Sequence, residues 1–213
     1  MHKKLVLVFA MAVVVLVAAC GPKEEAVAPE PAPVPEPEVV EEAAPVAVAV
    51  AVLQPRADSE VSGTVTFTET ADGVVVTADI ARIAPGLHGL HLHELGDCSA
   101  EDFKSTGGHF NPTDVPHGAP TDEMRHAGDF GNIEIGEDAA GHLELTTTML
   151  TVTDGPYTVV GRAVILHEGE DDLVSQPTGA AGGRLGCGVV VLEGTDMGEE
   201  IAEPMEEGSE VDG

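Results

Sequence analysis

The feature that most constrains this chain is a histidine-rich stretch between residues 88 and 129. It holds six histidines, with an aspartate at its end, Asp129, in a protein whose formal net charge is −29. His91 and His93 are separated by one residue in an apolar run that has no helical spacing. In a strand, residues two apart point to the same side of the sheet, so both imidazoles can reach one metal ion. The stretch therefore predicts a strand that presents a pair of metal ligands.

Further ligand candidates lie in segments bounded by glycine and proline, which indicate loops, and at the end of a later apolar run. They are His109, His117, His126, Asp129 and His167. A transition metal takes three or four protein ligands, so seven candidates predict two sites rather than one. Ligation by histidine alone suits copper, and three histidines with a carboxylate suit zinc. Ordinary surface or core histidines remain the alternative for any single member of the set.

Alternating apolar residues predict a domain built from strands. Val46 to Leu53 alternates valine and alanine, and the segments 61–69 and 74–81 are joined by a predicted hairpin turn at Ala71–Gly73. Four later segments continue the pattern: 131–135, 142–152, 157–167 and 186–192. No stretch has a convincing helical period, and the turns are rich in glycine and proline. Residues 46–194 are therefore predicted to form one all-β sandwich or barrel.

The same residues resemble the copper/zinc superoxide dismutases over positions 46–193. The resemblance is carried by GLHGLHLHELGD at 86–97, GGHFNP at 107–112, DEMRHAGDFGN at 122–132, VGRAVILHE at 160–168 and GGRLGCGV at 182–189. It implies an eight-stranded Greek-key flattened β-barrel, an immunoglobulin-like sandwich with two long functional loops. It also implies one copper and one zinc ion per subunit. The implied reaction converts two superoxide ions and two protons to dioxygen and hydrogen peroxide through Cu(II)/Cu(I) cycling.

Individual roles follow from the same resemblance, position by position. The implied copper ligands are His91, His93, His109 and His167, and the implied zinc ligands are His109, His117, His126 and Asp129. His109 would bridge the two ions and take a proton when it releases reduced copper. Asp171 matches a carboxylate that accepts hydrogen bonds from one ligand on each side, with Asp172 as an adjacent competitor. Arg184 matches the arginine that docks superoxide.

The sequence also departs from the family pattern. The segment between His167 and Arg184 is shorter than in the eukaryotic enzymes and contains no lysine. Pro177 stands about where those enzymes carry a guiding lysine, although Thr178 and Gly179 keep the pattern. The strong negative charge makes nucleic acid an unlikely partner and opposes the long-range approach of superoxide. Attraction must therefore come from the metals and from nearby arginine, within roughly 8 Å at physiological salt.

The ends of the chain predict export and anchoring. Residues 1–19 have the basic, apolar and small-residue regions of a signal peptide, and Cys20 follows as in a bacterial lipobox. A plain secretory signal is the alternative. Lipid at Cys20 would anchor the protein to the bacterial envelope, and Gly21 favours the outer membrane over the inner. Residues 20–45 are predicted to form a disordered tether and residues 195–213 an acidic tail.

The two remaining cysteines, Cys98 and Cys187, are expected to form a disulfide. An exported setting favours the bond, the resemblance implies the same pairing, and free buried thiols are the alternative. The resemblance does not carry over an oligomeric state, so a homodimer stays open. The competing functions are a module that stores copper or zinc and a structural surface lipoprotein. The complete set of implied ligands and Arg184 favour the enzyme.

Overall fold

The computed structural model describes residues 46–194. Its strands are β1 (Val48–Pro55), β2 (Ser62–Thr70), β3 (Gly73–Ala81), β4 (Gly86–His93), β5 (Asp129–Ile135), β6 (Ala140–Thr147), β7 (Ala163–His167), β8 (Arg184–Val189) and β9 (Val191–Leu192). The predicted signal peptide (1–19), the tether with Cys20 (20–45) and the acidic tail (195–213) lie outside the described residues.

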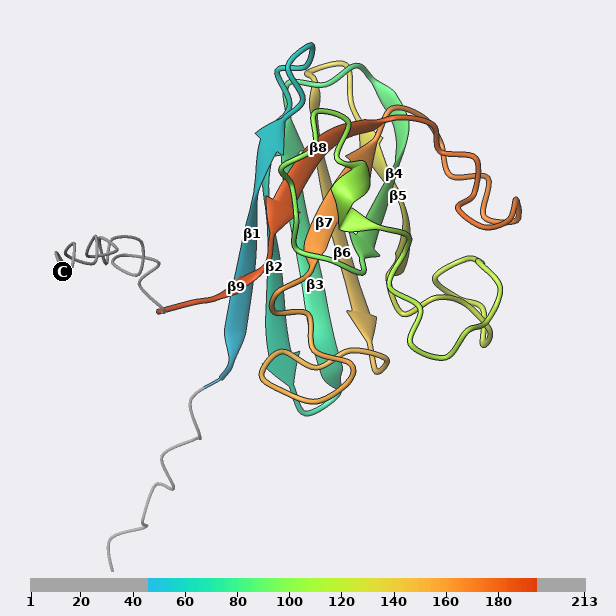
Figure 1. The fold of residues 1–213 in the computed structure, drawn as a ribbon. Helices are drawn as coiled ribbons and strands as arrows, with labels where there is room; N and C mark the ends of the chain where they lie inside the picture. The colour runs from blue at the N-terminus through green and yellow to red at the C-terminus, as the bar shows by residue number, and fades with distance from the viewer. Residues whose placement is uncertain (1–45, 195–213) are drawn as a thin grey trace, which may run out of the picture. The chain divides into compact units, whose positions relative to one another are not determined.

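The strands form a nearly closed antiparallel barrel (Figure 1). Their order is β5-β4-β7-β8-β1-β2-β3-β6, and β9 pairs with β1 on the edge opposite β2, next to the β8 pairing. The crossings from β3 to β4 and from β6 to β7 carry the chain between the two halves of the barrel, so the connectivity is a Greek key. Strands β8 and β9 are two parts of the predicted segment 186–192, interrupted at Val190. The predicted eight-stranded Greek-key barrel is confirmed.

The interior is filled by alternate residues of the strands. On β1 the buried face consists of Ala49, Ala51 and Leu53, whereas the valine face lies outside and Val52 is 64% exposed. Ala49 lies opposite Phe67 of β2, which is completely buried. A small residue beside a large one keeps the interior filled without overlap, because protein cores are close-packed. The alternation of valine and alanine therefore matches the available space.

Two predicted strands are shorter in the structure than their apolar patterns suggested. Strand β6 ends at Thr147 although the segment to Val152 was predicted, and β7 begins at Ala163 although 157–167 was predicted. Leu150, Val152 and Val159 are nevertheless buried in the core. The spacing of apolar residues indicates which side chains are buried, not whether the backbone forms a strand. These side chains enter the core from a loop that is not part of the sheet.

Two long connections complete the domain and lie on one side of the barrel in Figure 1: residues 94–128 between β4 and β5, and residues 168–183 between β7 and β8. The hairpin predicted at Ala71–Gly73 is present, with Thr70 paired to Gly73. Within residues 46–194 the only helical element is the short 3-10 turn Lys104–Thr106. No described helix is long and apolar enough to cross a bilayer.

Candidate metal centre

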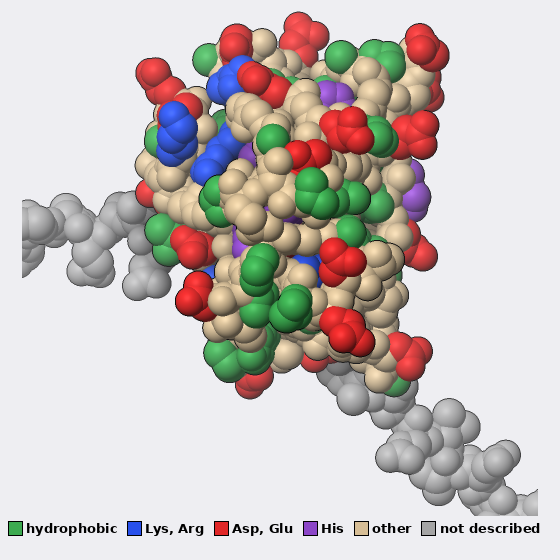
Figure 2. Space-filling model, turned by 90° about the vertical axis from the view of Figure 1, so that its right-hand side faces the viewer, with side chains coloured by type: hydrophobic (Ala, Val, Ile, Leu, Met, Phe, Trp, Pro, Cys, Tyr) green, Lys and Arg blue, Asp and Glu red, His purple; other side chains and the backbone are tan. Residues whose placement is uncertain are grey.

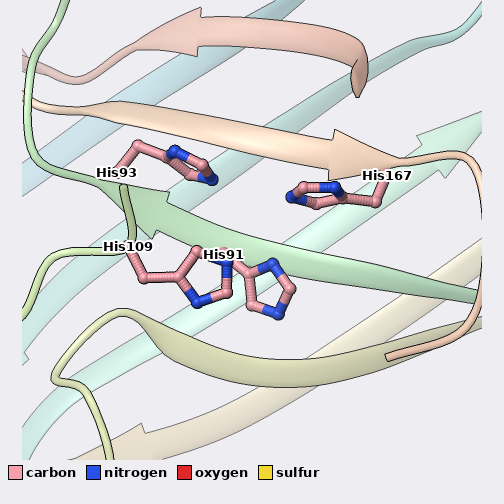
Figure 3. Close-up of side chains that lie close together, drawn as sticks. All are labelled: His91, His93, His109 and His167. Carbon is pink, nitrogen blue, oxygen red and sulfur yellow. The ribbon is translucent and has the colours of Figure 1, made fainter. Parts of the chain in front are cut away.

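Strands β4 and β7 hold three of the four histidines that face one another in Figure 3. His91 and His93 lie two residues apart on β4, and both side chains are fully buried on the same side of the strand. His167 ends β7, the neighbour of β4, after an irregularity in the β7–β8 pairing. His109 reaches the group from the long loop through an isolated bridge to His93. One nitrogen from each of the four lies within 4.8 Å of the others.

A second group of four lies next to the first and shares His109 with it. Its other members are His117, His126 and Asp129, and the four ligand atoms again lie within 4.8 Å of one another. Asp129 opens β5, whereas the histidines come from the loop before it. All four are at least 95% buried. The structure thus brings together every ligand candidate named from the sequence, in the two groups expected.

Hydrogen bonding indicates what these groups can hold. Six buried ring nitrogens make no well-aligned hydrogen bond: His91 Nδ1, His93 Nε2, His109 Nε2, His117 Nδ1, His126 Nδ1 and His167 Nε2. Two of them, His117 Nδ1 and His126 Nδ1, still lie 3.0 and 3.2 Å from Asp129 Oδ1, as ligands of one ion would. A buried polar atom without a partner costs about 1–3 kcal/mol, so a native core rarely leaves one, and six together fit nitrogens that coordinate metal ions. Neutral imidazole nitrogens of this kind fit copper and zinc. The residues present therefore fit two transition-metal ions.

The other ring nitrogens are oriented by groups behind the site. The Asp171 carboxylate lies 2.7 Å from His91 Nε2 and 2.9 Å from His117 Nε2, so it joins the two metal groups. Asp172 instead accepts hydrogen bonds from the amides of Val174 and Ser175 at the surface. The geometry thus places Asp171, and not Asp172, between the ligands. Such contacts fix the tautomer and the ring orientation of a ligating histidine.

Two side-chain amides, which were not identified from the sequence, hold this arrangement in place. Asn132 exchanges two hydrogen bonds of 2.8 Å with the main chain of Asp171. Gln176 does the same with the main chain of His117, at 2.9 Å in both directions. These pairs tie the 168–183 loop to β5 and to the loop that carries the zinc-side histidines.

Burial and charge set the protonation of the metal-free site. Burial lowers the pKa of His91, His93 and His167, and it lowers that of His109 to about 4 despite the nearby Asp129. These imidazoles are therefore neutral, as a ligand must be. Burial also opposes charge on His117, but the carboxylates of Asp129 and Asp171 outweigh it and raise the pKa of His117 to about 9.

His88 is the histidine of β4 that takes no part in either group. Its ring nitrogens lie 3.0 Å from the carbonyl oxygens of His167 and of Ala84. It therefore holds the end of β7 in place through the backbone. His142 lies at the surface and pairs with Asp79.

Arg184 lies at the start of β8 and lines the same cavity as His167 of the first histidine group. Its guanidinium donates to the carbonyl oxygens of Phe103 and Gly107 and to the hydroxyl of Thr106, at 2.7 to 2.8 Å. It lines a cavity of about 290 Å³ together with His167 and Thr178. A permanently charged fork of donors held beside a metal group can receive a small anion. The arrangement therefore offers room for a small anion between Arg184 and His167.

The predicted disulfide between Cys98 and Cys187 is present. It connects the 94–128 loop to β8 across 89 residues of sequence. The three acceptors that hold Arg184 follow Cys98 in the same loop. The bond therefore fixes the loop against the strand from which Arg184 projects.

Comparisons with known proteins agree with this geometry. The family model described as copper/zinc superoxide dismutase (SODC) matches residues 61–190. Among solved structures, the crystal structure of the clock protein EA4 is similar at 41% sequence identity, with a TM-score of 0.61. That match covers 67% of this chain and 92% of the other. The matched residues include both groups of ligands, Arg184 and the disulfide.

Proposed function

Because the chain belongs to the copper/zinc superoxide dismutase family, an oxidoreductase family, we propose that it disproportionates superoxide with one copper and one zinc ion per subunit. The observation that carries the proposal is the pair of buried groups that share His109 and leave six ring nitrogens without partners. His91, His93, His109 and His167 would hold the copper. His109, His117, His126 and Asp129 would hold the zinc.

The metals and the protein would contribute different parts of the reaction. Bound copper would exchange one electron with superoxide in each half of the cycle, whereas zinc is not redox-active. The chain's own residues would bind and orient the substrate. Arg184 would receive the superoxide anion in the cavity beside His167. His109 Nδ1 is 2.8 Å from Asp129, so its partnerless Nε2 would face the copper and would hold a proton between the two half-reactions of one cycle.

Copper or zinc storage is the main alternative, and one observation favours catalysis over it. A storage module needs the ligands but no anion path. Here Arg184 is held by three hydrogen bonds in a cavity that His167 also lines. A structural lipoprotein would need neither group of ligands.

Activity of the purified protein loaded with copper and zinc tests this function. We expect fast copper-dependent loss of superoxide that His167→Ala abolishes. His142→Ala removes an exposed histidine and serves as the matched control. A fully loaded wild type without turnover would contradict the enzymatic proposal and leave metal storage as the better account.

We also propose that the protein works in the bacterial envelope, where it removes extracytoplasmic superoxide. The signal-like residues 1–19 and Cys20 support export and a lipid anchor, and Gly21 favours the outer membrane. The disulfide supports an oxidising compartment. Cys20→Ala should move the protein from the membrane fraction to the soluble fraction. Unchanged fractionation would contradict the anchor, and sedimentation of the purified chain would distinguish a monomer from a homodimer.

A further inference from the structure

The cavity beside Arg184 has two further cations on its lining, although the 168–183 loop contributes none. They are Arg56, from the turn after β1, and Lys104, from the 3-10 turn. Lys104 is highly exposed and paired with Asp102, which lines the same cavity. Arg56 is different because its side chain is only 21% exposed. It also lines a neighbouring cavity of about 530 Å³, so it lies between the two.

Arg56 is held in place from several directions. Its main-chain amide donates to the carbonyl oxygen of Leu185 at 2.8 Å, and its Nη1 donates to the carbonyl oxygen of Arg184 at 3.1 Å. Its Nη2 lies 2.6 Å from Glu168 Oε1, and its Nε binds Asp58. The guanidinium is therefore fixed beside the backbone of the residue that receives the anion.

Glu168 is the carboxylate that needs this neutralisation. It follows His167 directly, and its amide donates to the carbonyl oxygen of Gly183, the residue before Arg184. A Cβ atom on Gly183 would lie only 2.7 Å from the Glu168 carboxylate, so the negative charge sits against the wall of the cavity. Its side chain is 46% exposed. Without Arg56, the charge of Glu168 would have no cationic partner beside Gly183, which lines the cavity proposed to receive superoxide.

Charge is unevenly distributed on the face drawn in Figure 2, where basic side chains gather in one area and acidic side chains are spread over the rest. In a protein with a net charge of −29 the long-range field opposes an anion, so the local balance at the cavity decides the approach.

We propose that Arg56 sets the electrostatic potential at the entrance of the cavity by neutralising Glu168, and that this neutralisation speeds the arrival of superoxide at Arg184. The inference rests on the proposed dismutase function. Arg56 lines the cavity without a hydrogen bond to any metal-ligand candidate, so its effect comes from its charge and from its bond to the Arg184 backbone. Charges at the rim of a binding site change the association rate and its dependence on salt.

The test measures kcat/KM against ionic strength for metal-loaded wild type, Arg56→Met, Glu168→Gln and the double variant, with metal content checked. Arg56→Met should lower kcat/KM about 3- to 10-fold at low salt. The difference should shrink as salt shortens the screening length from about 30 Å at 0.01 M to about 3 Å at 1 M. The double variant should recover most of the loss, and Arg56→Lys should stay within about 2-fold of wild type because it keeps the charge.

Several outcomes would overturn the inference. These are an unchanged rate in Arg56→Met at low salt, an equal loss at all salt concentrations, or a double variant as slow as Arg56→Met. If Arg56→Met does not fold, Glu168→Gln tests the inference by itself. Removing the Glu168 charge should raise kcat/KM about 2- to 5-fold at low salt, and an unchanged kcat/KM would overturn the inference. Glu144→Gln, which removes an exposed carboxylate from β6, is the matched control and should have no such effect.

A second measurement does not depend on turnover. Paramagnetic relaxation of the Gly182 and Gly183 amide protons by anionic and cationic cosolutes reports the local potential in solution. Arg56→Met should make the local potential more negative, and Glu168→Gln should make it more positive. An unchanged potential in both variants would overturn the inference. Inactive loaded wild type would refute the dismutase function, whereas unchanged potentials in active protein would refute only the role of Arg56.

Discussion

Gly179 should be irreplaceable because the Asp171 carboxylate occupies the space of its missing side chain. A Cβ atom on Gly179 would overlap Asp171 Oδ1 and would lie 2.7 Å from His117 Nε2. Its φ of +63° adds strain for any other residue. Gly179→Ala must therefore displace the carboxylate that joins His91 to His117.

The size of the effect follows from the backbone strain at Gly179 and from the contacts that the Asp171 carboxylate loses. A left-handed backbone costs an alanine about 1–2 kcal/mol. Displacing Asp171 disturbs its hydrogen bonds with His91, His117 and the Leu173 amide, and a hydrogen bond to a charged group contributes about 1.5–3 kcal/mol. Loss of a carboxylate behind a ligating histidine weakens metal binding about 10- to 100-fold. We therefore expect Gly179→Ala to lower zinc affinity by at least about tenfold and to lower the melting temperature of the loaded protein.

The chain offers a matched control in Gly161. Its φ is +80°, and a Cβ atom there would meet nothing within 4 Å, so Gly161→Ala carries the backbone strain alone. Competition with a chromogenic chelator gives zinc affinity, and calorimetry gives stability. Zinc affinity in Gly179→Ala within about threefold of wild type, or equal to that of Gly161→Ala, would refute the reasoning.

Four further results are expected. Gln176→Leu should weaken zinc binding because it removes both hydrogen bonds to the main chain of His117 and leaves those polar groups unpaired. The same chelator competition measures the affinity, and an unchanged value would show that these two hydrogen bonds do not support the site. Arg184→Lys should lower kcat/KM more than about tenfold at full copper content, because an ammonium cannot reproduce the guanidinium fork; equal rates in a superoxide assay would argue against anion docking. Cys98→Ser should lower the free energy of unfolding by about 2–5 kcal/mol in denaturant titrations, and a smaller loss would mean that the loop is held by other contacts. Removing both metals with a chelator should lower the melting temperature markedly, since six buried nitrogens lose their ligands; equal melting with and without metal would contradict the ligand assignment.

Much of the barrel was predictable because its signals are local. The hairpin at Ala71–Gly73 and the pair His91 and His93 each depend on a few neighbouring residues and on a strand period of two. The lengths of β6 and β7 were not predictable, because Leu150 and Val159 are buried although they lie outside these strands. Which face of β1 is buried depended on the space that Phe67 fills from β2.

The sequence by itself determined the kind of chemistry this protein can perform. Ligand types at strand and loop spacings are properties of the chain, and they predicted two metal groups before any geometry was known. Only the tertiary structure decided how those groups are supported. Asp171 rather than Asp172 lies between His91 and His117, and Arg56 reaches Glu168 across 112 residues of sequence. Such contacts have no local signal, because the long loops and the closure of the barrel bring distant residues together.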